Sequence, residues 1–94
     1  MAAFIMFGSY TKESMKDMSS NRTGKAVDVI KKHKGEVKAM YALLGQQDLM
    51  LITEFPEANN AMKASIALTK LTGITFSTSP AISVEEFDQM IVEV

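Results

Sequence analysis

Two segments of this sequence are predicted to be β-strands with apolar residues on both faces, and this feature constrains the fold more than any other. Side chains of a strand alternate between its two faces. In segments 3–10 and 48–55 both sets are apolar: Phe4 and Met6 oppose Ile5 and Phe7, and Leu49 and Leu51 oppose Met50 and Ile52. An antiparallel sheet with one face in water carries polar residues on that face. Both faces are therefore expected to be covered.

The expected elements follow the order strand, helix, strand, strand, helix, strand, with a short helix at the end. Aromatic and β-branched runs predict the strands, and apolar residues at helical spacing predict the helices. The strands are expected at 3–10, 36–44, 48–55 and 74–79, and the helices at 21–34, 57–72 and from residue 84. This order indicates a ferredoxin-like α+β fold with an antiparallel sheet in strand order 4-1-3-2 and both main helices on one face. The length suits one domain, residues 1–94.

Short signals mark the ends of these elements. Gly35 and Gly73 follow the two main helices and are expected to stop them. Helix starts are offered by Thr11, by Ser19-Ser20-Asn21, and by a capping box at Ser83–Glu86. Gly45-Gln46-Gln47 is expected to form a hairpin turn, and Pro80 to end the last strand.

The two main helices can cover one face of the sheet, so the other face needs a second cover. The open side of the sheet would lose roughly 6–12 kcal/mol of burial free energy if Ile5, Phe7, Met50 and Ile52 stayed in water, at about 1.5–3 kcal/mol for each side chain. The final helix is expected to turn Val84, Phe87, Met90 and Ile91 inward, but about ten residues span only about 15 Å. We therefore expect a homodimer with the two sheets face to face, or a larger homo-oligomer.

Composition excludes several classes of function. The chain has no Cys and one His, His33, so neither a disulfide framework nor a zinc site of the usual spacing is expected, and no cofactor motif occurs. A pI of about 5.7 and the absence of an RNA-binding signature argue against nucleic acid. No apolar run approaches the length of a membrane span or forms an export signal, so a cytoplasmic location is expected.

The hairpin turn Leu44-Gly45-Gln46-Gln47-Asp48, followed by an apolar strand and then Glu54-Phe55-Pro56, resembles the GYD domain family. The resemblance runs from about Phe4 to Ile91 and includes Tyr10-Thr11 and the stretch 20–22. It implies a dimeric α/β-barrel fold and oligomerisation but no established activity. Gln47 stands where the family's turn has Tyr, so any role of that Tyr in holding a ligand or partner is lost or changed here.

Four polar residues lie on or next to the expected inner strands: Tyr10, Tyr41, Asp48 and Glu54. One hypothesis is that they line a small pocket between sheet and helices. The alternative is structural, with Asp48 fixing the turn and Glu54 pairing with a Lys at the strand end.

Three functions remain open at this level. The first is a protein that binds a small molecule or regulates a partner. The second is a cofactor-free enzyme acting on small organic acids or aromatics, which would need an acid or base of tuned pKa in a dry cavity. The third is an assembly module without a ligand. The absence of His from the expected strands disfavours the enzyme.

Overall fold

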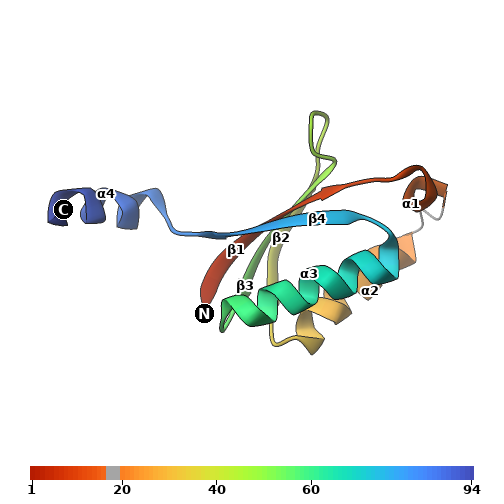
Figure 1. Ribbon diagram of the computed structural model, residues 1–94, viewed down its shortest axis with the longest axis horizontal. Helices are drawn as coiled ribbons and strands as arrows, with labels where there is room; N and C mark the ends of the chain where they lie inside the picture. Colours follow the sequence, from red (N-terminus) through yellow and green to blue (C-terminus); the bar gives the residue numbers. More distant parts are fainter. Residues whose placement is uncertain (17–19) are drawn as a thin grey trace.

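The computed structural model describes residues 1–16 and 20–94 and contains the expected order of elements (Figure 1). These elements are β1 (Ala2–Ser9), α1 (Lys12–Lys16), α2 (Ser20–Lys32), β2 (Glu36–Ala42), β3 (Leu49–Phe55), α3 (Ala58–Thr72), β4 (Thr75–Ala81) and α4 (Val84–Glu93). The helix cap expected at Ser19 lies outside the described residues. The α+β fold class predicted from the sequence is confirmed.

All strand pairs are antiparallel, and the order β2-β3-β1-β4 confirms the predicted topology. Figure 1 shows α2 and α3 on the same side of this sheet. Residues paired across neighbouring strands share a face, so the register defines what each face presents. On the face away from the helices, one row is Tyr41, Met50, Phe7 and Ser77, and the next is Ala39, Ile52, Ile5 and Ser79. We call this surface the open face.

The core lies between the sheet and the two helices. Met6, Leu51 and Phe55 from the sheet are almost fully buried, as are Ile30 of α2 and Leu68 of α3. Ala61 and Ala64 let α3 approach the sheet closely, and both are buried. Thr53 is also fully buried and donates its hydroxyl to the Phe4 carbonyl oxygen at 2.8 Å, so its polar atom has a partner. The predicted division of each strand into two faces therefore holds for β1 and β3.

Two predicted strand ends are wrong. β4 continues through Pro80 to Ala81, because β4 is an edge strand and a proline there can turn its missing N–H away from the sheet. β2 ends at Ala42 rather than at Leu44. The Leu43 N–H still donates to the Asp48 carbonyl at 2.8 Å, but Leu44 is fully exposed at the tip of a longer connection.

The end of α2 also differs from expectation. Lys34, not Gly35, takes the left-handed conformation, with φ 68°. The Gly35 N–H then donates to the Ile30 carbonyl at 2.9 Å, which closes the helix. Gly35 is needed for another reason: a Cβ there would fall on the ring of buried Phe55.

Replacing Lys34 with Gly is expected to stabilise the protein by about 0.5–1 kcal/mol, because glycine adopts this backbone conformation without the Cβ clash. Urea unfolding should show a higher midpoint with an unchanged m value. The matched control is Lys25→Gly inside the helix, which should cost about 1 kcal/mol. Equal losses from both substitutions would contradict the assigned backbone conformation.

The prediction that α4 turns its apolar side inward is wrong. Figure 1 shows α4 extending away from the sheet, and none of its residues is buried. Phe87 is 53% exposed, Met90 48% and Ile91 55%. A two-residue connection after β4 continues the direction of the edge strand, so α4 does not fold back over its own sheet. The chain's own tail therefore leaves the open face uncovered.

Candidate ligand-binding site

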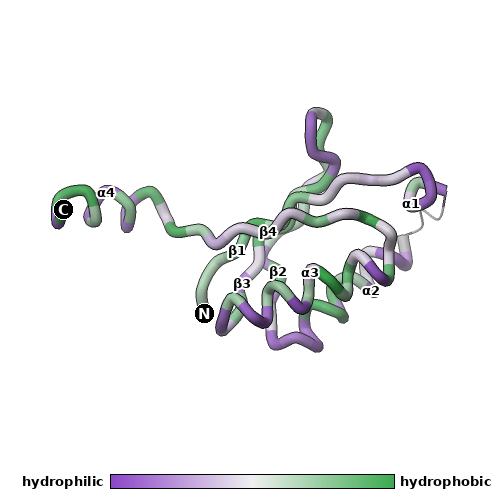
Figure 2. The backbone as a smooth tube through the Cα atoms, viewed as in Figure 1, coloured by the Kyte–Doolittle hydropathy of each residue, from purple (hydrophilic) through white to green (hydrophobic). Residues whose placement is uncertain are grey.

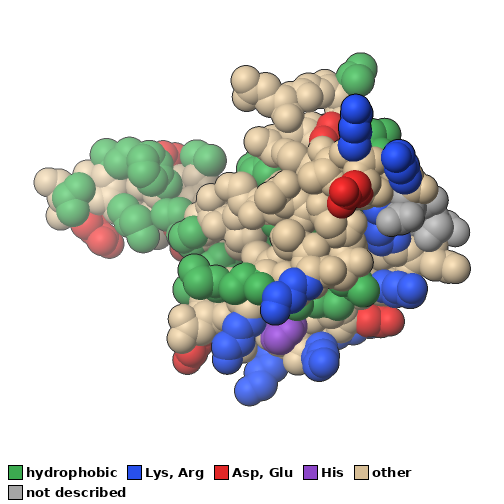
Figure 3. All heavy atoms as spheres, turned by 45° about the vertical axis from the view of Figure 1, so that its right-hand side comes forward, with side chains coloured by type: hydrophobic (Ala, Val, Ile, Leu, Met, Phe, Trp, Pro, Cys, Tyr) green, Lys and Arg blue, Asp and Glu red, His purple; other side chains and the backbone are tan. Residues whose placement is uncertain are grey.

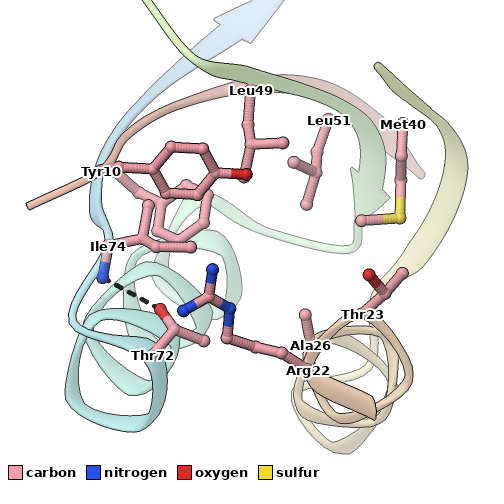
Figure 4. Close-up of a pocket in the computed structure, with 10 residues that line it drawn as sticks. Tyr10, Arg22, Thr23, Ala26, Met40, Leu49, Leu51, Thr72 and Ile74 are labelled. Atoms are coloured by element: carbon pink, nitrogen blue, oxygen red, sulfur yellow. Dashed lines mark hydrogen bonds between the residues drawn. The ribbon is translucent and has the colours of Figure 1, made fainter. Parts of the chain in front are cut away.

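A pocket of about 320 Å³ lies between the sheet and the helices, at the end of the sheet where β1 stops (Figure 4). Its wall is mostly apolar, with one cation and three hydroxyl-bearing side chains. The lining residues are Tyr10, Arg22, Thr23, Ala26, Met40, Leu49, Leu51, Thr72, Ile74 and Phe76. This size and composition are typical of a site for a small organic molecule.

Arg22 is the only charged side chain among these residues and the only arginine of the chain. Figure 4 shows its guanidinium reaching from α2 across the floor of the pocket, below the ring of Tyr10. The carbon of the guanidinium lies 5.7 Å from the centre of that ring, within cation–π range. One nitrogen donates to the Ser14 carbonyl at 2.5 Å. A guanidinium has five N–H donors, so others can serve a ligand.

The position of Arg22 in its helix is electrostatically unusual. It lies in the first turn of α2, which has no acidic residue. The amino end of a helix carries partial positive charge and favours anions, so a cation there gains nothing from the helix. Among the described residues, every ion pair involves Lys38, so no carboxylate lies within 4 Å of this guanidinium. The helix end and Arg22 thus present positive potential to the same cavity.

The carbonyl that holds Arg22 belongs to a well-defined turn. Thr11 Oγ1 accepts from the Ser14 N–H at 3.0 Å, and Ser14 Oγ accepts from the Thr11 N–H at 2.7 Å. This reciprocal pair starts α1 at the predicted Thr11 cap. Ser14 is 1% exposed, so its carbonyl is a fixed point against which Arg22 is oriented.

The hairpin turn fixes the other side of the pocket. Asp48 Oδ2 accepts from the Tyr10 N–H at 2.8 Å, and Gln47 Oε1 accepts from Ser9 Oγ at 2.8 Å. The Asp48 N–H donates to the Gly8 carbonyl at 2.9 Å. These bonds hold the chain just after β1 and so place the Tyr10 ring over the cavity (Figure 4). Gln47 stands where the turn of the GYD family has Tyr. Its side chain thus contacts the last residue of β1, directly before Tyr10.

The structure brings together two of the four candidate residues. Tyr10 lines the pocket and Asp48 holds its backbone. Tyr41 is 53% exposed on the open face, opposite Met50. Glu54 lies 3.9 Å from Lys38 at the end of the sheet, and Glu36 lies 3.5 Å from the same lysine. Neither Tyr41 nor Glu54 is among the pocket-lining residues.

Sequence reasoning did not single out Arg22. A signal was present: a lone arginine in the first turn of a helix, where acidic residues are favoured. The apolar wall comes from β2, β3, β4 and α2 and from the segments after β1 and before β4, so only the tertiary structure assembles it.

The chemistry available in the pocket is recognition of an anion on an apolar body. Among the described residues, none of those that line the pocket is a carboxylate, imidazole or amine that could act as a general acid or base at neutral pH. The Thr72 hydroxyl donates to the Leu68 carbonyl at 2.7 Å and accepts from the Ile74 N–H at 3.1 Å, so it is occupied structurally. Within the described ranges, no group of three His, Asp or Glu side chains gathers as a metal site would require.

Comparisons with known proteins agree with this architecture. The crystal structure of the leucine response regulatory protein LrpA from Mycobacterium tuberculosis has a similar fold, with a TM-score of 0.58 and 7% sequence identity. The match covers 87% of this chain and 51% of LrpA, so the chain spans about half the length of that protein. No curated protein has a significantly similar sequence. The family model of the GYD domain matches residues 4–91, nearly the whole chain, and the protein therefore belongs to the GYD domain family.

Proposed function

We propose that this GYD-domain protein is a homodimer that binds a small carboxylate with an apolar body in the pocket between its sheet and helices. The observation that carries the proposal is the Arg22 guanidinium in a cavity whose other lining residues are uncharged and mostly apolar. The ligand's carboxylate would pair with Arg22, and its body would contact side chains such as Leu49, Leu51 and Phe76. Desolvation of the apolar walls would supply affinity, and the charge would supply specificity.

The volume sets the size of the ligand. A cavity of about 320 Å³ is at the small end of ligand sites and suits a molecule of roughly ten non-hydrogen atoms. The fold shared with a leucine response regulatory protein is compatible with a role that responds to a small molecule. Among the described residues that line the pocket there is no carboxylate, imidazole or amine, which favours binding over catalysis.

The proposed dimer rests on the open face. Ile5, Phe7, Met50 and Ile52 lie side by side on it, and nothing in the described part of the chain packs over them. Packing two such faces together removes this surface from water, which is the driving force for sheet-on-sheet association. The pocket lies on the other side of the sheet, so the two proposals can fail independently.

Binding is tested by isothermal titration with phenylacetate and hexanoate, each paired with its neutral amide. Because a hydrogen bond to a charged group contributes about 1.5–3 kcal/mol, Arg22→Gln should weaken carboxylate binding about 10- to 150-fold. It should leave binding of the amides nearly unchanged. The control is Lys25→Gln, which removes an exposed cation from the same helix.

Two outcomes would contradict the binding site. One is that amides and carboxylates bind equally well to the unmodified protein. The other is that no carboxylate of this size binds at all, which would favour the assembly module without a ligand.

A further inference from the structure

The acidic terminal helix α4 has an apolar face that its own chain leaves in water. Ile82, Val84, Phe87, Met90, Ile91 and Val94 are all exposed by 48% or more. In a ten-residue helix, Val84, Phe87 and Ile91 are spaced three and four apart, so they form one stripe. Figure 2 shows hydrophobic and hydrophilic residues alternating along this helix. Such a stripe is typical of a helix that packs against another surface.

The charges of α4 restrict what that surface can be. Glu85, Glu86, Asp88 and Glu93 give the segment after β4 a charge of −4, and it contains no Lys or Arg. The chain has 10 basic and 11 acidic residues, so residues 1–81 carry 10 − 7 = +3. A partner for α4 should therefore combine an apolar patch with positive charge, and the rest of this chain has that sign.

The open face offers the apolar patch through Ile5 and Ile52, and the end of the sheet where β2 begins offers the positive charge. Lys31, Lys32 and Lys34 are exposed at the end of α2, directly before β2 begins. Among the described residues, no carboxylate is within ion-pair distance of these three lysines, while Lys38 is held by Glu36 and Glu54. Figure 3 shows basic side chains gathered over the helices, with hydrophobic side chains beside them. We call the exposed lysines at 31, 32 and 34 the lysine cluster.

The register places this end of the sheet at the same level as the start of α4. Ala81 pairs with Ala3, Ala3 with Glu54, and Glu54 with Glu36, so the end of β4 and the start of β2 belong to one row. Within one chain they lie at opposite edges of the sheet, because the order is β2-β3-β1-β4. A second copy facing the open face can bring its β2 edge alongside β4, which would bring its lysine cluster next to α4.

We infer that α4 of each copy docks on the second copy, with its apolar stripe against the open face of the partner sheet and its acids beside the partner's lysine cluster. This inference rests on the proposed homodimer and adds an exchanged arm to it. Charge complementarity between exchanged elements would fix the orientation of the two copies. Each α4 would cover the part of the partner's open face that remains exposed to water at the end of the sheet when the two sheets pack together.

The chain contains no cysteine, so engineered cysteines report this contact without interference. Full-length Asp88→Cys and full-length Lys34→Cys proteins are mixed under mild oxidation. A disulfide that joins position 88 of one 10.3 kDa chain to position 34 of another is expected, identified by the mass of the linked peptides after proteolysis. The mismatched mixture of Asp88→Cys with Asn59→Cys, on the exposed face of α3, should give at least tenfold less of the corresponding disulfide.

A charge exchange tests the electrostatic part. Reversing the three lysines of the cluster to Glu, or Glu85, Glu86 and Asp88 to Lys, should each weaken the dimer about 10-fold or more at low salt. Mixing the two reversed proteins should restore the affinity, because the charges are again opposite across the contact. In 1 M NaCl both charge reversals should weaken the dimer less, because salt screens the charges.

The outcomes separate this inference from the dimer itself. A native mass of two chains without the Asp88–Lys34 disulfide, and with no effect of charge reversal, would overturn the exchanged arm and leave the sheet contact standing. A native mass of one chain would overturn the dimer. A disulfide formed efficiently within one chain carrying both cysteines, with no linked pairs, would show that α4 folds back on its own sheet and would also overturn the inference.

Discussion

Ile52→Lys is expected to convert the proposed dimer into folded monomers. Ile52 lies in the middle of the open face, between Ala39 and Ile5, and it is already half-buried in one chain. Pairing the sheets would complete its burial in both copies, for about 1.5–3 kcal/mol in total. In the Ile52→Lys variant each copy would bury one ammonium group instead, and this costs a further free energy of association of at least similar size. The dissociation constant should therefore rise by about 10²–10⁴-fold.

Sedimentation equilibrium measures this change directly, and circular dichroism checks that the variant remains folded. The matched control is Asp28→Lys on the exposed side of α2, which should leave the mass unchanged. Ile52→Val should also retain the dimer because it keeps the surface apolar. Unchanged association of the Ile52→Lys variant would show that the open face is not the contact between copies.

Phe55→Ala is expected to cost about 3–5 kcal/mol of the free energy of unfolding, the largest loss for any single side chain in this core. Phe55 is fully buried, and its ring packs edge-on against Phe4 with centres 5.9 Å apart. The ring also fills the space left by the absent side chain of Gly35. The cavity left by truncation cannot close easily, because β2, β3 and α2 meet there through paired backbone.

Urea denaturation of the purified variant provides the measurement, with the midpoint falling and the m value retained. Small domains have only about 5–15 kcal/mol of stability, so this loss could unfold a large fraction of the protein at 37 °C. Leu44→Ala is the control, because Leu44 is fully exposed at the hairpin tip and its removal should change stability by less than about 0.5 kcal/mol. A loss below about 1 kcal/mol for Phe55→Ala would contradict the assigned packing.

The prediction of the fold succeeded where local signals agreed. The presence of a turn around Gly45, the stop at Gly73 with φ 74° and the Ser83 cap on the Glu86 N–H are all local, and each was visible in the sequence. The errors arose where tertiary position decides. Pro80 remains in β4 only because β4 is an edge strand, and Lys34 adopts the left-handed backbone while Gly35 makes room for Phe55.

The candidate site was predicted less completely. The sequence pointed to Tyr10 and Asp48, and the bond between the Asp48 carboxylate and the Tyr10 N–H links them across 38 positions of chain. It did not point to Arg22, because a single basic residue on a polar helix is usually in solvent. Tyr41 was grouped with Tyr10, but the alternation of β2 turns it to the open face.

The sequence by itself determined the order of elements, the antiparallel topology and the two apolar faces, because strand alternation and helix spacing are properties of neighbouring residues. Only the tertiary structure decided that α4 extends outward and that Arg22 faces a cavity. Both depend on which distant segments lie together: the pocket needs α2 beside the end of β1, and the direction of α4 follows from the path of an edge strand.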